Sequence, residues 1–277
     1  MRIITDPIEL QQEALVRRAR GERIGFVPTM GYLHAGHTSL MDLARPRCDW
    51  LVVSIYVNPL QFGPDEDLDR YPRDPQGDAA KCAAAGTDVL FMPTSLYPVD
   101  HGTRVLVTGL TEGLCGTSRP GHFDGVTTVV SRLFGLVQPS LAVFGEKDFQ
   151  QLAVLRRMTR DLALPIEVVG GPLVRDTDGL ALSSRNRYLS TTDRARGRTL
   201  HQSLFAIRDT VAASPGPLPT APLLDQARAA LSVDQIDYLD IRHPDTLERL
   251  DTIDGPAHAF VAAMVGQTRL IDNVRLR

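Results

Sequence analysis

Apolar residues in the first part of the chain follow two alternating patterns. Runs of consecutive apolar residues, which predict short buried strands, lie at residues 24–27, 51–57, 89–92, 141–144 and 166–169. Segments with the apolar spacing of helices lie at residues 7–20, 36–44, 76–85, 125–136 and 150–162. Strands that alternate with helices in this way indicate a parallel sheet covered on both faces. The predicted fold class is α/β, with a doubly wound, Rossmann-like parallel sheet.

The pattern changes in the C-terminal part of the chain. A polar loop over residues 175–186 precedes a long helical pattern at 192–213, and the Pro-rich stretch SPGPLPTAP at 214–222 is typical of a linker or exposed loop. The residues beyond it predict a helix and then three strands, at 235–241, 259–265 and 268–273. We therefore expect two domains. The first covers residues 1–180, and a smaller C-terminal α/β domain, residues 181–277, closes over the ligand-binding edge of the first.

Three loops with unusual polar residues directly follow predicted strands. They lie at residues 28–37, 58–63 and 145–151. Ligands of doubly wound sheets bind outside the carboxyl ends of the strands. We expect these loops to line one cleft.

The first of these loops, PTMGYLHAGH, places two histidines three residues apart at the start of a helix. Free backbone N–H groups and the helix dipole favour anions there, Gly36 allows a close approach, and the imidazoles of His34 and His37 can donate to phosphate oxygens. The alternatives are histidines that only cap the helix, or a metal site, for which no carboxylate or cysteine stands at a matching offset. The loop resembles the HxGH signature of the nucleotidyltransferase superfamily, which implies adenylyl chemistry and a nucleotide-binding domain but no particular substrate.

Two later segments add positive groups. In GEKDFQQL, Lys147 can reach phosphates as a mobile charge, although the segment is also compatible with a turn in which Asp148 caps the next helix. In LALSSRNRYL, Ser183, Ser184 and Arg185 make a flexible, donor-rich stretch suited to a triphosphate or departing pyrophosphate. Serine-rich loops are usually only solvated, so this segment by itself is a weak indication of a phosphate-binding site and serves as supporting information.

Two segments are less specific. VNPLQFGPDEDLDRYPR offers Asn58 and Gln61 as neutral hydrogen-bonding groups, but from the residues alone an Asn-Pro turn with an incidental Gln is the better interpretation. Its acidic run, residues 65–69, is typical of a solvated face, and a magnesium-related role is the alternative. SRPGHFDGV brings Arg119 and His122 to a Pro-Gly turn, either as a substrate lid or as an ordered loop.

Composition and charge exclude several partners. The 277 residues are 43% hydrophobic and 23% charged with a formal net charge of −3, which gives no bulk electrostatic reason to bind nucleic acid or anionic membrane, so any anion site must be built locally. Cys48, Cys82 and Cys115 lie too far apart for metal pairs or a small disulfide framework. The first residues do not resemble a secretory signal, and no apolar stretch approaches the roughly 20 residues that span a bilayer. We expect a cytoplasmic protein.

Six motifs together resemble the pantothenate synthetase family across nearly the whole chain. They are PTMGYLHAGH, NPLQFGPDEDLDRYPR, SRPGHFDGV, FGEKDFQQL, DGLALSSRNRYL and TRLIDN, spread from residue 28 to residue 273. The resemblance implies an ATP-dependent, AMP-forming condensation of (R)-pantoate with β-alanine, which gives pantothenate, AMP and pyrophosphate through a pantoyl adenylate. It also implies Mg²⁺ with the ATP and a homodimer. Thr38 and the Pro-rich stretch depart from the family pattern, at positions with no predicted role in chemistry.

The same resemblance assigns site residues. The predicted ATP contacts are Met30, Gly31, Tyr32, Leu33, His34, Ala35, Gly36, His37, Gly145, Glu146, Lys147, Asp148, Val174, Leu182, Ser183, Ser184 and Arg185. Gln61 and Gln151 match the glutamines that hold pantoate, and Gln61 also matches the contact to β-alanine. The catalytic candidates are His37, in the place of the proton donor, and His34, Lys147 and Arg185. No protein ligand is assigned to a metal.

These assignments agree with the chemistry of the reaction. A carboxylate that attacks a polyanionic phosphate needs positive groups to screen repulsion and to stabilise the departing pyrophosphate. Pantoate's own carboxylate is the nucleophile, so neither serine is expected to react covalently. Two other interpretations stay open: a simple nucleotidyltransferase, which would not need Gln61 and Gln151, and an inert nucleotide-binding protein on the same fold.

Overall fold

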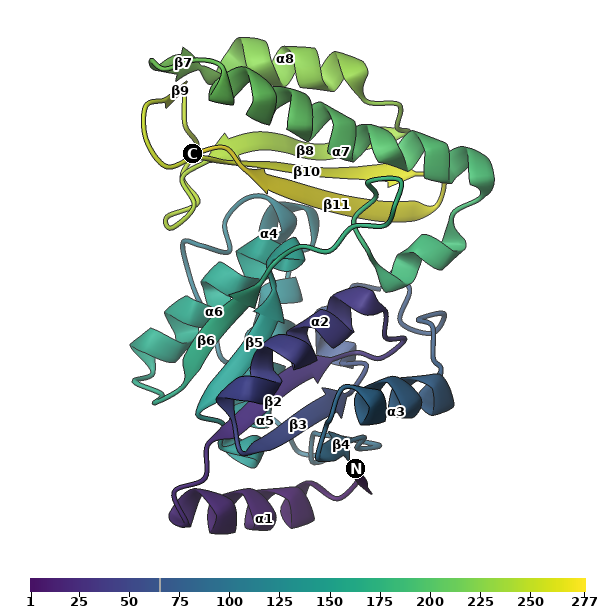
Figure 1. The fold of residues 1–277 in the computed structure, drawn as a ribbon, viewed down its shortest axis with the longest axis vertical. Helices are drawn as coiled ribbons and strands as arrows, with labels where there is room; N and C mark the ends of the chain where they lie inside the picture. Colours follow the sequence, from purple (N-terminus) through teal and green to yellow (C-terminus); the bar gives the residue numbers. More distant parts are fainter. Residues whose placement is uncertain (65) are drawn as a thin grey trace. The chain divides into compact units, whose positions relative to one another are not determined.

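The structure is a computed structural model that describes residues 1–64 and 66–277. Its contacts divide the chain into two compact units (Figure 1). The first comprises Met1–Glu112, Arg119–Glu146 and Gln151–Pro172, and the second comprises Gly113–Ser118, Lys147–Gln150 and Leu173–Arg277. The predicted functional division at residue 180 stays a prediction. Among the described residues, no helix is long and apolar enough to cross a membrane.

A six-stranded parallel sheet organises the first unit. Its spatial order is β1-β4-β3-β2-β5-β6. The strands are β1 (Arg2–Ile4), β2 (Ile24–Thr29), β3 (Trp50–Ile55), β4 (Val89–Phe91), β5 (Leu141–Gly145) and β6 (Glu167–Gly171). From β2 the chain winds outward through β3 and β4 and then returns to place β5 on the other side of β2. The direction of winding therefore reverses between β2 and β5, and the predicted doubly wound α/β fold is confirmed.

Helices cover both faces of this sheet (Figure 1). They are α1 (Pro7–Ala19), α2 (Ala35–Ala44), α3 (Pro75–Ala84), α5 (His122–Val137) and α6 (Phe149–Asp161). Side chains at the N-termini explain where two of them begin: Asp6 accepts from the Ile8 backbone N–H at 2.8 Å, and Asp74 accepts from Gly77 at 3.0 Å. The segment predicted to be helical from residue 125 begins earlier, at His122, after Gly121 takes a positive φ of 78°.

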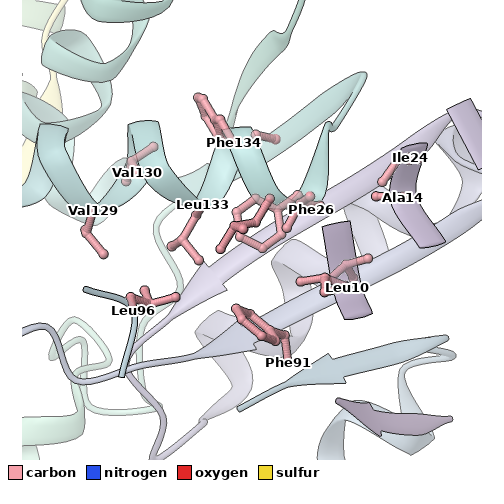
Figure 2. Packing of buried hydrophobic residues seen from close by; sticks show 14 of the residues in the cluster. Leu10, Ala14, Ile24, Phe26, Phe91, Leu96, Val129, Val130, Leu133 and Phe134 are labelled. Carbon is pink, nitrogen blue, oxygen red and sulfur yellow. The ribbon is translucent and has the colours of Figure 1, made fainter. Parts of the chain in front are cut away.

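Alternate residues of each strand face opposite cores. Phe26 and Phe91 pack with Leu10 of α1 and with Leu133 and Phe134 of α5, as Figure 2 shows. The neighbouring strand residues, such as Val27 and Val53, pack instead against α2 and α3. This explains why the strands are continuous apolar runs in the sequence, because both of their faces are buried. Strand β1 escaped prediction because only Ile4 of its three residues is buried.

The second unit is built on a three-stranded antiparallel sheet in the order β11-β10-β8. Its strands are β8 (Gln235–Arg242), β10 (His258–Val265) and β11 (Thr268–Arg275), with α4 (Cys115–Ser118), α7 (Thr191–Ala212) and α8 (Thr220–Ala230) as helices. Apolar residues of α7, including Leu200 and Leu204, form a core with Leu239 and Val261 of the sheet. The predicted smaller C-terminal α/β arrangement is confirmed.

The prediction that the Pro-rich stretch is a linker or exposed loop holds only for its first part, since residues 214–217 lie outside any helix or strand. Its last residues form β7 (Leu218–Pro219), paired with β9 (Thr252–Ile253), and then the first turn of α8. The Arg277 guanidinium donates to the carbonyls of Ser214 and Gly216 at 2.8 Å. Proline is compatible with a short edge strand and with the first turn of a helix, so the composition alone did not distinguish these from a loop.

Candidate active site

The loop that leaves β2 is fixed to its neighbours by side chains and by a glycine. Thr29 donates through Oγ1 to the Ser54 carbonyl of β3 at 2.8 Å and accepts from the Gly31 N–H at 3.2 Å. Gly31 has a φ of +89°, and a Cβ at this position would lie 2.9 Å from Cγ2 of Ile55. Only glycine fits this turn without strain. The turn directs the chain across the point where the sheet reverses its winding.

Asp78 of α3 holds the next part of the loop. Its carboxylate, in a residue only 1% exposed, accepts from the backbone N–H of Tyr32 at 2.8 Å and from that of Leu33 at 2.7 Å. Tyr32 has a φ of +51°, a conformation that non-glycine residues adopt only when their surroundings hold it. The role of Asp78 has no local pattern in the sequence, because its contacts join residues more than 40 positions apart.

His34 and His37 form a capping box at the N-terminus of α2. Nδ1 of His34 accepts from the Gly36 N–H, and Nδ1 of His37 accepts from the His34 N–H, each at 3.2 Å. The two rings lie 4.1 Å apart between centroids. An accepting Nδ1 carries no proton, so each ring is a neutral tautomer with its proton on Nε2. Both histidines therefore cap the helix, and whether they also bind phosphate stays a prediction. The same bonds leave the proton of each ring on Nε2, at a helix N-terminus that favours anions.

Gln61 lies beside this loop, at the end of the 3₁₀ helix η2 (Pro59–Gln61). Asn58 caps η2 by accepting from Leu60 at 3.3 Å, and its Nδ2 donates to Gln61 Oε1 at 3.1 Å. This leaves the Gln61 amide nitrogen 3.2 Å from the Met30 sulfur. The expected Asn-Pro turn is therefore present, and it also orients the side chain of Gln61.

Arg119 and His122 clamp the backbone of Gln61. Nδ1 of His122 donates to the Gln61 carbonyl at 2.9 Å, and Arg119 donates to the same carbonyl at 3.3 Å. Arg119 also makes a bidentate ion pair with Glu66 at 2.6 and 2.7 Å. Burial alone would raise the pKa of Glu66, but the hydrogen bonds and charge of Arg119 hold it below its usual range. The prediction of a solvated acidic face is wrong for Glu66, and Asp65 lies outside the described residues.

Gly145, Glu146 and Gln151 occupy the carboxyl end of β5 and the start of α6. Gly145 pairs with Gly171 of β6, and Gln151 is half-buried on the first turns of α6. The neighbouring Gln150 belongs to the second unit, where it accepts from the Cys115 N–H at 2.9 Å and donates to the Gly113 carbonyl at 3.0 Å. The first unit thus brings together the Met30–His37 loop and Gln61, with Gly145 on the strand next to β2.

The remaining predicted residues belong to the second unit. Nζ of Lys147 lies 3.7 Å from the Asp148 carboxylate. The Leu182 N–H donates to the Val174 carbonyl at 3.0 Å, and Ser183 caps the 3₁₀ helix η4 (Ser184–Tyr188) by accepting from the Arg185 N–H at 3.3 Å. The stretch predicted to be flexible is therefore a hydrogen-bonded turn. Within the described part of the chain, no group of three or more His, Cys, Asp or Glu side chains is arranged to hold a metal ion.

Comparison with known proteins assigns this arrangement to a family. The family model for pantoate–β-alanine ligase matches residues 2–275. The chain belongs to the pantoate–β-alanine ligase family. The pantothenate synthetase of Oleidesulfovibrio alaskensis is 51% identical over 282 residues, which cover 100% of each chain. This membership confirms the predicted family and the predicted ligase activity.

Solved structures of pantoate–β-alanine ligases have the same fold. The crystal structure of pantothenate synthetase from Thermus thermophilus superposes with a TM-score of 0.92 at 48% identity and covers 100% of this chain and 99% of its own. The ligase from Francisella tularensis, in complex with β-γ ATP and β-alanine, has a TM-score of 0.78 at 30% identity over 99% and 97% of the two chains. The individual site residues of the present ligase stay predictions.

Proposed function

We propose that this ligase joins (R)-pantoate to β-alanine in two steps, with a pantoyl adenylate as intermediate. The observation that carries the proposal is the capping box of His34 and His37, which presents two Nε2–H donors where the sheet reverses its winding. The complex of the Francisella tularensis relative with β-γ ATP and β-alanine supports the choice of two substrates. The third substrate, pantoate, follows from the family.

In the first step, a pantoate carboxylate oxygen attacks the α-phosphorus of ATP. A new P–O bond forms, the bond to the β-phosphate breaks, and pyrophosphate leaves with the electron pair. The Nε2–H groups of His34 and His37 and the positive end of α2 stabilise charge on the phosphate oxygens. We assign Lys147 and Arg185 to the departing pyrophosphate, because fixed positive groups are required where that charge develops.

In the second step, the amine of β-alanine attacks the acyl carbon and a C–N bond forms. The acyl C–O bond to AMP breaks, AMP leaves with the electron pair, and the proton that the amine loses passes to water. Gln61 and Gln151 are proposed to hold pantoate, and Gln61 also β-alanine, because a neutral amide can bond a hydroxyl or a carboxylate without adding charge. The bond from Asn58 Nδ2 fixes Oε1 of the Gln61 side chain and directs its NH₂ group toward Met30. His37, which occupies the place of the family's proton donor, is proposed to act in the first step by donating the hydrogen bond of its Nε2–H to a phosphate oxygen.

Four further proposals concern the metal ion, the two domains, the location and the assembly. Mg²⁺ enters as part of the MgATP substrate, held mainly by phosphate oxygens and water. Residues 1–180 bind ATP and pantoate, and residues 181–277 close over them during turnover. The ligase acts in the cytoplasm as a homodimer. Sedimentation would measure the assembly, and equal protease sensitivity at the junction with and without ATP plus pantoate would contradict closure.

Product analysis tests the proposal. Purified ligase is incubated with MgATP and pantoate, with and without β-alanine, and the products are measured by mass spectrometry. We expect pantothenate and AMP only with both substrates, and a bound adenylate with pyrophosphate release when β-alanine is omitted. Pyrophosphate formed with another acceptor but not with pantoate would indicate a simple nucleotidyltransferase. Nucleotide binding without turnover would indicate an inert binding protein.

A further inference from the structure

The TRLIDN motif has no part in the chemistry proposed above, yet its last two polar side chains are buried. Asp272 and Asn273 are adjacent on β11 and are only 4% and 7% exposed. Buried polar side chains are retained where they make several hydrogen bonds. Each of the two bonds a different segment of the second unit.

Asp272 holds the base of the Val174–Arg185 turn. Its two carboxylate oxygens accept from the Arg175 guanidinium at 2.7 and 2.8 Å, in the bidentate geometry that fixes orientation as well as distance. The same guanidinium donates to the Gly179 carbonyl at 3.1 Å. Arg175 follows Val174 directly, and Val174 bonds Leu182 across the turn. The ion pair therefore anchors the turn that carries Ser183 to Arg185.

Asn273 holds the backbone of Lys147. Its Nδ2 donates to the Lys147 carbonyl at 2.9 Å, and its Oδ1 lies 2.8 Å from Nε2 of His258. Because Lys147 offers only a carbonyl here, the amide orientation is fixed, and His258 must be the donor to Oδ1. The Asn273 N–H in turn donates to Asp272 at 2.7 Å, so the two residues form one connected network.

We propose that Asp272 and Asn273 are positioning residues. They fix the two segments of the second unit that are proposed to bind ATP, the segment of Lys147 and the turn that carries Arg185. Successive side chains of a strand point in opposite directions, which lets two neighbours reach two separate segments. Asn273 acts through Lys147, and Asp272 acts through the turn that carries Arg185. This inference rests on the proposed roles of Lys147 and Arg185 in binding ATP.

Two readouts test this role, ATP-analogue affinity by calorimetry and the rate of pyrophosphate release. Asn273→Asp keeps the acceptor for His258 but loses the donor to Lys147, and Asn273→Ala loses both. A misplaced phosphate group costs up to about 100-fold in rate, so we expect each variant to lower pyrophosphate release by about 10- to 100-fold and to weaken analogue binding. The KM for β-alanine should be unchanged. Arg275→Gln, on the exposed end of the same strand, is the matched control and should leave both of these readouts unchanged.

Double variants separate positioning from a merely structural role. In a Lys147→Ala background, Asn273→Asp should cause no further loss, because the side chain through which it acts is gone. In an Arg185→Ala background, Asp272→Asn should likewise cause no further loss. Additive losses, or a Lys147→Ala variant with unaltered rate and affinity, would overturn the inference. If the unaltered chain forms no pantothenate, the proposed function fails. The positioning role can then still be tested by calorimetry, which measures whether the single and double variants have coupled or additive effects on nucleotide affinity.

Discussion

Asp78 makes the loop before α2 depend on a buried carboxylate that lies more than 40 residues farther along the chain. It accepts from two consecutive backbone N–H groups, those of Tyr32 and Leu33. A positive φ costs a non-glycine residue about 1–3 kcal/mol, and the two hydrogen bonds to Asp78 offset this cost at Tyr32. The orientation of the histidine loop is therefore set by α3 as well as by its own sequence.

We predict that Asp78→Asn lowers kcat/KM for ATP by about 10-fold or more. The amide oxygen of Asn can accept one of the two hydrogen bonds, but its NH₂ group would face the second N–H donor and cannot accept from it. Steady-state kinetics with varied ATP would measure this loss. Asp74→Ala is the control on the same helix, since it removes the cap to Gly77 and should cost about 1 kcal/mol of stability without changing kcat/KM. Unaltered kcat/KM in Asp78→Asn would disprove the role of Asp78.

His258 gives the second unit a pH-dependent stability. Burial lowers its pKa to about 4, the charge of Arg275 adds to this, and the bond to Asn273 opposes it. Between pH 6.5 and 4 the unfolded chain therefore binds a proton that the folded chain does not, so stability falls as the pH falls through this range. The expected loss is about 3 kcal/mol. Urea unfolding at about pH 7 and about pH 4 should show a smaller difference in His258→Gln than in the unaltered chain, and an equal difference would contradict the assignment.

At the scale of elements, α5 and η2 meet through a glycine. A Cβ at Gly125 would overlap the Leu60 carbonyl and lie 2.6 Å from the Gln61 Cα. Asn58 also bonds the Gly125 carbonyl, at 3.0 Å. The helix can therefore approach the substrate-binding turn closely only because position 125 has no side chain.

Gly125→Ala should displace Gln61 and raise the KM for pantoate by about 10-fold or more, since a misplacement of about 1 Å has large effects in a preorganised site. ATP-analogue affinity should change little, because the His34 loop is held by Asp78. The control is Gly135→Ala on the same helix, where an added Cβ meets nothing within 4 Å and should stabilise by up to about 1 kcal/mol. Substrate kinetics and thermal unfolding of both variants would decide, and a normal pantoate KM in Gly125→Ala would exclude the displacement.

At the scale of the whole molecule, the sequence predicts helices and strands better than it predicts hydrogen bonds between distant residues. Strands such as residues 141–144 could be identified because burial on both faces leaves an apolar run, and the histidine loop because glycines and histidines follow a strand. Asp78 and Asn273 could not be found, since their partners are backbone groups of distant segments. The composition of the Pro-rich stretch did not predict β7 or the start of α8, because proline is compatible with loops, edge strands and the first turn of a helix.

Isotope transfer tests the central claim most directly, that pantoate is activated as its adenylate. The ligase is supplied with MgATP, β-alanine and pantoate labelled with ¹⁸O in both carboxylate oxygens, and AMP is analysed by mass spectrometry. Attack on the α-phosphorus predicts one ¹⁸O in each AMP and one retained in pantothenate. Labelled pantothenate formed together with unlabelled AMP would contradict the account, because the carboxylate oxygen would then never have been bonded to the α-phosphorus.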